Sequence, residues 1–194
     1  MTPPRLILGS TSTYRAELLR RVFPEFEQRA PGTDESARPG ETPADRALRL
    51  AIAKAEAAGM GQTDALVIGS DQVAELHGAV LDKPGVAERA RAQLAASSGQ
   101  EVHFHTALCL FDTRDGMRYT HVDHTRVQFR VLSETEIARY VARENPLDCA
   151  GSFKCEGLGI SLFEQIDNQD PTALIGLPLI GLTRLLREAG VSVP

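Results

Sequence analysis

The stretch LVIGSDQVAELHGAVLDKP, Leu66–Pro84, is the part of the sequence around which the expected fold is built. It begins with three apolar residues, a short run that is typical of a strand buried on both faces. Asp71 then falls where such a strand ends or bends, His77-Gly78 predicts a hairpin turn, and Lys83 follows the second arm. An acidic residue at the end of a buried strand, with a lysine brought beside it by the hairpin, is an arrangement that can bind a metal ion and phosphate. An ordinary hairpin with solvated charges has the same pattern.

The composition is that of an ordinary globular protein. Of the 194 residues, 42% are hydrophobic and 24% are charged, and the formal net charge is −5. This balance disfavours attraction to nucleic acid or to an anionic membrane, and no apolar run is long enough to span a bilayer. The three cysteines form no CxxC pair and the first residues do not resemble a signal peptide, so we expect a cytoplasmic protein with reduced thiols.

The first segment predicts an anion site at the start of a helix. A strand is expected from Arg5 to Leu8, followed by a turn over Gly9–Ser12 and a helix to about Phe23. Backbone N–H groups at the positive end of a helix attract anions. Arg15 lies on the first helical turn, where it would be near a bound anion, although a surface arginine would fit the pattern equally well.

A polar loop and a second helix contribute further candidates. Residues 24–42 are rich in proline, glycine and acidic residues, with Asp34-Glu35 at the centre. Such a pair can ligate a metal ion, although acidic pairs in loops are usually just solvated. Thr42 followed by proline predicts a helix start, and the apolar and alanine positions of that helix place Lys54 near one edge of its buried face.

The remaining elements predict an α/β protein with a mixed, twisted sheet. A helix is expected over Val86–Ala96, and two long strands over Glu101–Phe111 and about Met117–Val131 are joined by an Asp-Gly hairpin turn. A capping box opens a helix from Ser133 to about Arg143. Residues Thr172–Gly190 have a helical pattern with a break at Gly-Leu-Pro.

Three parts of the sequence together resemble the Maf family. They are LILGSTSTYRAELL at residues 6–19, IGSDQVAELHGAVLDKP at 68–84, and AGSFKCEGLGISLFEQI with DPTALIGLPLIGLTRLL at 150–166 and 170–186. The resemblance implies one Maf-like domain over residues 1–194, with a mixed sheet in two lobes around a cleft, as in the inosine triphosphate pyrophosphatases, and a homodimer. It also implies a hydrolase that splits a nucleoside triphosphate between its α- and β-phosphates.

Within the family, SDQV at residues 70–73 and SFKCEGLG at 152–159 look like the branch that acts on 7-methyl-GTP. That activity yields 7-methyl-GMP and diphosphate and would remove modified nucleotides. Tyr14 agrees with this branch, whereas Thr13 stands where the family normally has proline. The dTTP/UTP branch usually has SDT, an arginine in place of Tyr14 and a glutamine in place of Glu156. A dTTP/UTP pyrophosphatase and a nucleotide-binding regulator of septum formation without relevant turnover remain the alternatives.

The resemblance gives each candidate residue a role toward a small nucleotide substrate. Asp71 is the candidate base, and Glu35 and Asp71 are the candidate ligands of a divalent cation, Mg²⁺ or Mn²⁺. Asp71 can instead serve mainly as a metal ligand. The residues expected to bind the triphosphate are Ser10, Arg15, Lys54 and Lys83. The residues expected to select the base are Tyr14, Gln72 and Glu156.

Overall fold

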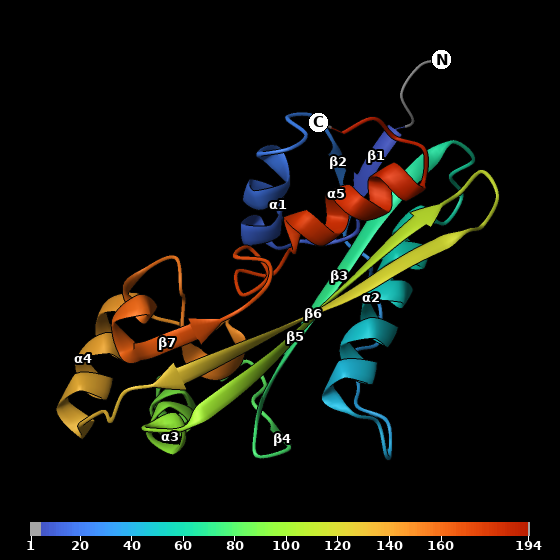
Figure 1. Ribbon diagram of the computed structural model, residues 1–194. Coiled ribbons are helices and arrows are strands. Elements are labelled where there is room, and N and C mark those ends of the chain that lie inside the picture. Colours follow the sequence, from blue (N-terminus) through green and yellow to red (C-terminus); the bar gives the residue numbers. More distant parts are fainter. Residues whose placement is uncertain (1–4, 194) are drawn as a thin grey trace. The chain divides into compact units, whose positions relative to one another are not determined.

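The computed structural model describes residues 5–193 and has the predicted α/β architecture (Figure 1). The strands are β1 (Arg5–Leu8), β2 (Glu27–Gln28), β3 (Ala65–Leu76), β4 (Ala79–Val80), β5 (Glu101–Asp112), β6 (Arg118–Phe129) and β7 (Phe163–Asp167). The α-helices are α1 (Thr13–Arg20), α2 (Pro43–Gly59), α3 (Ala87–Ser97), α4 (Glu134–Glu144) and α5 (Leu179–Glu188), and two 3₁₀ turns cover Ala150–Ser152 and Leu158–Leu162. Within residues 5–193 no helix has the length and apolar character needed to cross a membrane.

The sheet is mixed, as the order of elements predicts. Its strands follow the order β2-β1-β3-β5-β6-β7, with β4 beside β3. Strand β1 pairs in parallel with β2 and β3, whereas β3 pairs with β4 and β6 pairs with β7 in the antiparallel sense. The predicted hairpin is confirmed, because Glu75 and Leu76 pair with Val80 and Ala79.

The chain divides into two compact units, which are described separately below. Unit 1 comprises the described residues within 1–71, 106–123 and 170–194, and unit 2 comprises residues 72–105 and 124–169. Strands β3, β5 and β6, each of 12 residues, contribute to both units. Of the candidate residues, Ser10, Tyr14, Arg15, Glu35, Lys54 and Asp71 belong to unit 1, and Gln72, Lys83 and Glu156 belong to unit 2.

In unit 1 an apolar core fixes the elements that carry the site. Buried leucines and isoleucines of β1, β3 and β5 pack with the apolar sides of α1 and α5. Helix α2 lies against the strands at Gly69, where an added Cβ would come 2.1 Å from the carbonyl oxygen of Ala51 and 2.6 Å from the backbone nitrogen of Ala55. Only glycine permits this approach, which brings the Lys54 turn of α2 beside β3.

In unit 2 a group of aromatic rings fixes the loop that carries Glu156. Phe153 meets Phe104, Phe129 and Phe163 edge to face, with ring centroids 5.3, 5.7 and 4.7 Å apart. Because Phe153 is buried among strand residues of the same unit, the backbone just before Glu156 has a defined position.

Two sequence-based expectations were wrong in detail. Asp71 was expected where the strand ends or bends, and the structure excludes the strand end, because β3 continues to Leu76 with Asp71 inside it. The polar side chains of Ser70 and Asp71 find partners within unit 1, and their burial therefore does not interrupt the strand. The predicted break at residues 176–178 is confirmed, since Gly176 has φ +125°, but the residues before it form turns, and the regular helix begins only at Leu179.

Candidate active site

The turn between β1 and α1 forms the predicted helix N-terminus. Ser12 is the N-cap of α1, and its Oγ accepts a hydrogen bond from the backbone nitrogen of Arg15 at 3.3 Å. The buried Ser10 is held at the same turn, because its Oγ accepts from the nitrogen of Ser12 at 3.1 Å and from Nη1 of Arg15 at 3.3 Å. The structure therefore brings Ser10 and Arg15 into contact at the turn for which the sequence predicts an anion site.

Arg15 is tied to the rest of unit 1 by a second contact. Its Nε donates to the carbonyl oxygen of Gly176 at 2.9 Å. Burial lowers the pKa of the Arg15 guanidinium, and the nearby carboxylates of Asp71 and Glu35 act in the opposite direction. The guanidinium thus lies within electrostatic reach of both candidate acidic residues.

Lys54, Asp71 and Glu35 form a charge cluster. The Nζ of Lys54 lies 2.6 Å from Oδ1 of Asp71 and 2.7 Å from Oε1 of Glu35. The side chains of Lys54 and Asp71 are only 7% and 10% exposed, whereas that of Glu35 is 53% exposed. A buried ammonium group requires such partners, because desolvating an unpaired charge is costly. Lys54 is thus more deeply buried than its expected place at the edge of the helix face.

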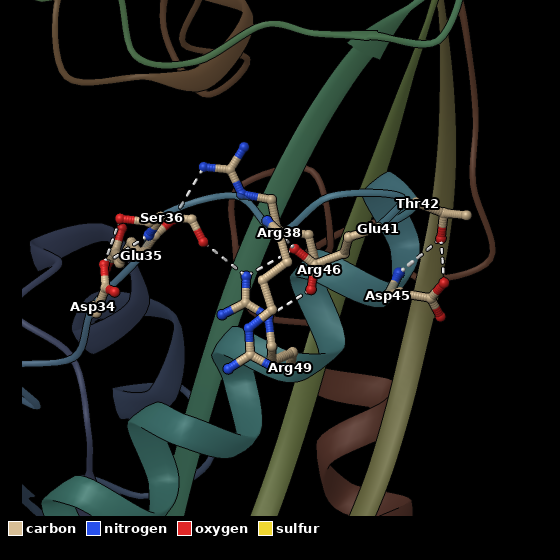
Figure 2. A network of polar contacts seen from close by, with 9 residues as sticks. All are labelled: Asp34, Glu35, Ser36, Arg38, Glu41, Thr42, Asp45, Arg46 and Arg49. Carbon is tan, nitrogen blue, oxygen red and sulfur yellow. Dashed lines mark hydrogen bonds and ion pairs between the residues drawn. The ribbon is translucent and has the colours of Figure 1, made fainter.

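Two arginines of α2 hold the loop that carries Glu35 (Figure 2). Nη2 of Arg46 donates to the carbonyl oxygen of Glu35 at 3.2 Å, and Nη2 of Arg49 donates to that of Ser36 at 3.0 Å. The same Nη2 also contacts Oε2 of Glu41 at 2.8 Å, and this pairing lowers the pKa of Glu41 to about 2. These arginines were not among the residues singled out from the sequence, although arginines one turn apart beside an acid-rich loop are a usable signal.

The segment after β4 carries Lys83, whose side chain is exposed. Two backbone hydrogen bonds join this segment to the loop before Glu156. The nitrogen of Gly151 donates to the carbonyl oxygen of Leu81 at 3.3 Å, and the nitrogen of Gly85 donates to that of Leu147 at 3.0 Å. Within unit 2, the segment that carries Lys83 therefore lies against residues 147–151.

The three residues expected to select the base occupy different environments. Tyr14 is half-buried in the first turn of α1 in unit 1. In unit 2, Gln72 is half-buried in β3, and Glu156 is exposed with its Oε2 3.5 Å from Sγ of Cys155. Burial raises the pKa of the Cys155 thiol to about 12, so this neighbour is a protonated thiol at neutral pH.

The acidic pair of the charge cluster suits a hard divalent cation. Mg²⁺ is usually held by one or two carboxylates together with substrate phosphate oxygens. Asp71 and Glu35 meet that description, because their oxygens converge on one cationic group within 2.7 Å. In the described part of the chain no three or more histidine, cysteine or acidic side chains are grouped to hold a metal ion on their own.

Comparison with known proteins connects this geometry with one family. The model of the family described as Maf-like protein matches residues 5–189. A protein of Xanthomonas axonopodis pv. citri (strain 306) is 57% identical over 192 residues, which cover 98% of this chain and 100% of the relative. A protein of Burkholderia thailandensis is 55% identical over 190 residues, which cover 96% of this chain and 88% of the relative. Both relatives are named 7-methyl-GTP pyrophosphatase.

Proposed function

The chain belongs to the Maf family, and on that premise we propose that it hydrolyses 7-methyl-GTP to 7-methyl-GMP and diphosphate. The observation that carries the proposal is the buried Lys54, held between Asp71 and Glu35 in a chain similar over nearly its whole length to relatives of that name. In this cluster the ammonium group can bind phosphate oxygens, and the two carboxylates can accept a proton from water and bind a metal ion.

The cationic residues act on the charge that moves during the reaction. Water attacks the α-phosphorus of the α–β anhydride, the bond from that phosphorus to the bridging oxygen breaks, and negative charge collects on the leaving diphosphate. Lys54, Arg15 and Lys83 neutralise this charge, and Ser10 with the backbone N–H groups of its turn adds hydrogen bonds. The paired Nζ of Lys54 is already desolvated and oriented, which strengthens its interaction with a phosphate oxygen.

Asp71 is the base that accepts a proton from the attacking water. Its buried carboxylate is fixed through Oδ1 by Lys54, so its position is set by the strand and by the ion pair. A positioned base of this kind typically contributes about 10²- to 10⁴-fold to the rate.

Glu35 and Asp71 would hold the divalent cation, Mg²⁺ or Mn²⁺, together with the phosphate oxygens of the substrate. When bound, this cation would supply Lewis-acid polarisation of the phosphates. The loop contacts from Arg46 and Arg49 keep the Glu35 backbone in place for this role.

The residues that select the nucleobase of the substrate are Tyr14, Gln72 and Glu156. Methylation at N7 gives guanine a delocalised positive charge, which an aromatic face such as Tyr14 attracts by roughly 0.5–2 kcal/mol. Guanine presents N1–H and N2–H₂ side by side, and a carboxylate such as Glu156 accepts both in parallel. Thymine and uracil present one N–H between two carbonyl oxygens, which suits a glutamine amide instead.

The test compares kcat/KM for 7-methyl-GTP, GTP, dTTP and UTP in the wild type, Tyr14→Arg and Glu156→Gln. We expect the wild type to prefer 7-methyl-GTP, and each variant to lose at least about tenfold of that preference. Glu164→Gln makes the same change at an exposed position of β7 and should leave the preference unchanged. A wild type that prefers dTTP or UTP, or one that binds nucleotides without turnover, would refute the assignment.

A further inference from the structure

The carbonyl group of Gly176 is a junction between distant parts of unit 1. It accepts a hydrogen bond from Nε of Arg15 at 2.9 Å and another from Oγ of Ser70 at 3.0 Å. A carbonyl oxygen has two lone pairs, so these contacts use its full capacity. One donor comes from α1 and the other from β3, directly before Asp71, so this single oxygen aligns a cationic residue of the site with the strand that carries the base.

The loop of residues 170–178 holds that carbonyl in place. Gly176 has φ +125°, a backbone conformation that favours glycine, and its nitrogen donates to the carbonyl oxygen of Ala173 at 2.9 Å. The same carbonyl oxygen of Ala173 accepts from Oγ1 of Thr106 in β5 at 3.0 Å. The loop is thus hydrogen-bonded to β5 through Ala173 and to Arg15 through Gly176.

Asp170 closes the loop and is only 2% exposed. Its Oδ1 accepts from the nitrogen of Thr172 at 3.0 Å and from Oγ1 of Thr172 at 2.7 Å. Its Oδ2 accepts from the nitrogens of Ile180 and Gly181, at 2.6 and 3.4 Å, in the first turn of α5. An ionised carboxylate offers about four acceptor sites, and here four donors fill them. The N-cap residue Pro178 makes no side-chain cap, so Asp170 supplies the acceptors and negative charge that this helix start favours.

We propose that Asp170 is a positioning residue for catalysis, which acts through the Gly176 carbonyl to orient the guanidinium of Arg15. The inference deepens the proposed function, because it rests on Arg15 as a ligand of the triphosphate. The contacts of Nε to Gly176 and of Nη1 to Ser10 fix the plane of the guanidinium and use two of its five N–H donors. The remaining fork is then held ready for two phosphate oxygens, and less orientational freedom is lost when substrate binds.

The first test is a double-mutant cycle with Asp170→Asn and Arg15→Ala. Asparagine keeps the shape of aspartate, but its amide NH₂ faces N–H donors where a carboxylate oxygen had accepted. We expect Asp170→Asn to lower kcat/KM for 7-methyl-GTP at least tenfold when Arg15 is present, and less than twofold in the Arg15→Ala background. An equal loss in both backgrounds would show that Asp170 supports only the fold, and would overturn the proposal.

The second test reads Arg15 directly and requires no turnover. We propose to follow hydrogen exchange of the Arg15 Nε–H by NMR, with Arg15→Lys used to assign the signal. Thr172→Val removes the hydroxyl that joins Asp170 to the backbone at Leu177 and Leu179, and should speed this exchange at least tenfold. Thr172→Ser keeps the hydroxyl and should stay near the wild-type rate. Unchanged exchange in Thr172→Val would refute the positioning role even if Asp170→Asn failed to fold. A wild type without turnover would refute the proposed function alone, because the exchange experiment would still give its answer.

Discussion

Replacing Asp71 with asparagine tests the charge cluster directly, because asparagine has nearly the same shape but carries no charge and cannot take up a proton. In the native protein both Asp71 and Glu35 contact Nζ of the buried Lys54. After the substitution Glu35 remains as the one carboxylate of the cluster, and it is the more exposed of the two. Breaking a buried ion pair typically costs about 3–5 kcal/mol, so with Glu35 still in place we expect a loss near 3 kcal/mol.

This loss leaves the protein folded at room temperature. In a domain of this size about 1 kcal/mol corresponds to a change of about 2–4 °C in Tm, so we expect the Tm to fall by about 6–12 °C. A native protein has about 5–15 kcal/mol of stability, which exceeds the expected cost. The turnover of the folded variant should nevertheless fall at least about 10²-fold, because the proposed general base is lost.

The assay measures diphosphate release from saturating 7-methyl-GTP, with a thermal unfolding curve recorded on the same preparation. Asp64→Asn is the matched control, because it makes the same chemical change at an exposed position of unit 1. We expect wild-type turnover and an almost unchanged Tm for the control. Wild-type turnover in folded Asp71→Asn would remove Asp71 from the reaction and refute the reasoning from the cluster.

Four further predictions follow from other parts of the structure. Removal of divalent cations by a chelator should abolish turnover, Mg²⁺ or Mn²⁺ should restore it, and orthophosphate as the first product would contradict cleavage between the α- and β-phosphates. Gly69→Ala should cost about 1–3 kcal/mol or more, measured by denaturant unfolding, because the new Cβ overlaps the backbone of α2. Burial raises the pKa of the Cys149 and Cys155 thiols from 9.0 to about 12, which lowers their thiolate fraction at pH 8 and is only partly offset by the higher nucleophilicity of the thiolate. We therefore expect both thiols to alkylate roughly 30- to 60-fold more slowly at pH 8 in the native protein than in the unfolded protein. Equal alkylation rates in the two states would contradict this. Because Arg49 lowers the pKa of Glu41 from 4.5 to about 2, Glu41→Gln should lower the Tm at neutral pH, and the difference from the wild type should vanish as the pH falls from about 4.5 to 2.

The elements that could be predicted from the sequence are those with local signals. Thr42 caps α2 and exchanges hydrogen bonds with Asp45, and Ser133 and Glu136 form the expected capping box of α4. In each case the donor and acceptor lie three residues apart, so the sequence contains the whole interaction. Strands β2 and β7 have no such signal and were missed, because their pairing with β1 and β6 depends on residues far away in the chain.

The site divides in the same way. The residue types and the family motifs indicated Arg15, Lys54 and Asp71, whereas the contact of Arg15 with Gly176 joins residues 161 positions apart. No periodicity or motif spacing predicts a hydrogen bond from a side chain to a particular distant carbonyl. The alternative of a strand end at Asp71 was wrong for a related reason, because a polar residue after an apolar run looks like a strand end until its distant partner, here Lys54, is known.

The burial of Lys54 gives a final reason to regard the charge cluster as functional. The alanine-rich face of α2 and the close approach at Gly69 bring the helix backbone against β3, so a long side chain at position 54 has little access to solvent. Well-packed apolar residues in place of a buried ion pair are often neutral or stabilising, by about 1–4 kcal/mol, so stability alone does not favour a lysine here. The ammonium group of Lys54 is instead desolvated before substrate binds and is held by two acidic side chains. Such a fixed, desolvated cation can stabilise the negative charge that collects on a leaving diphosphate. The packing around Gly69 and the chemistry proposed for Lys54 are therefore two consequences of the same helix position.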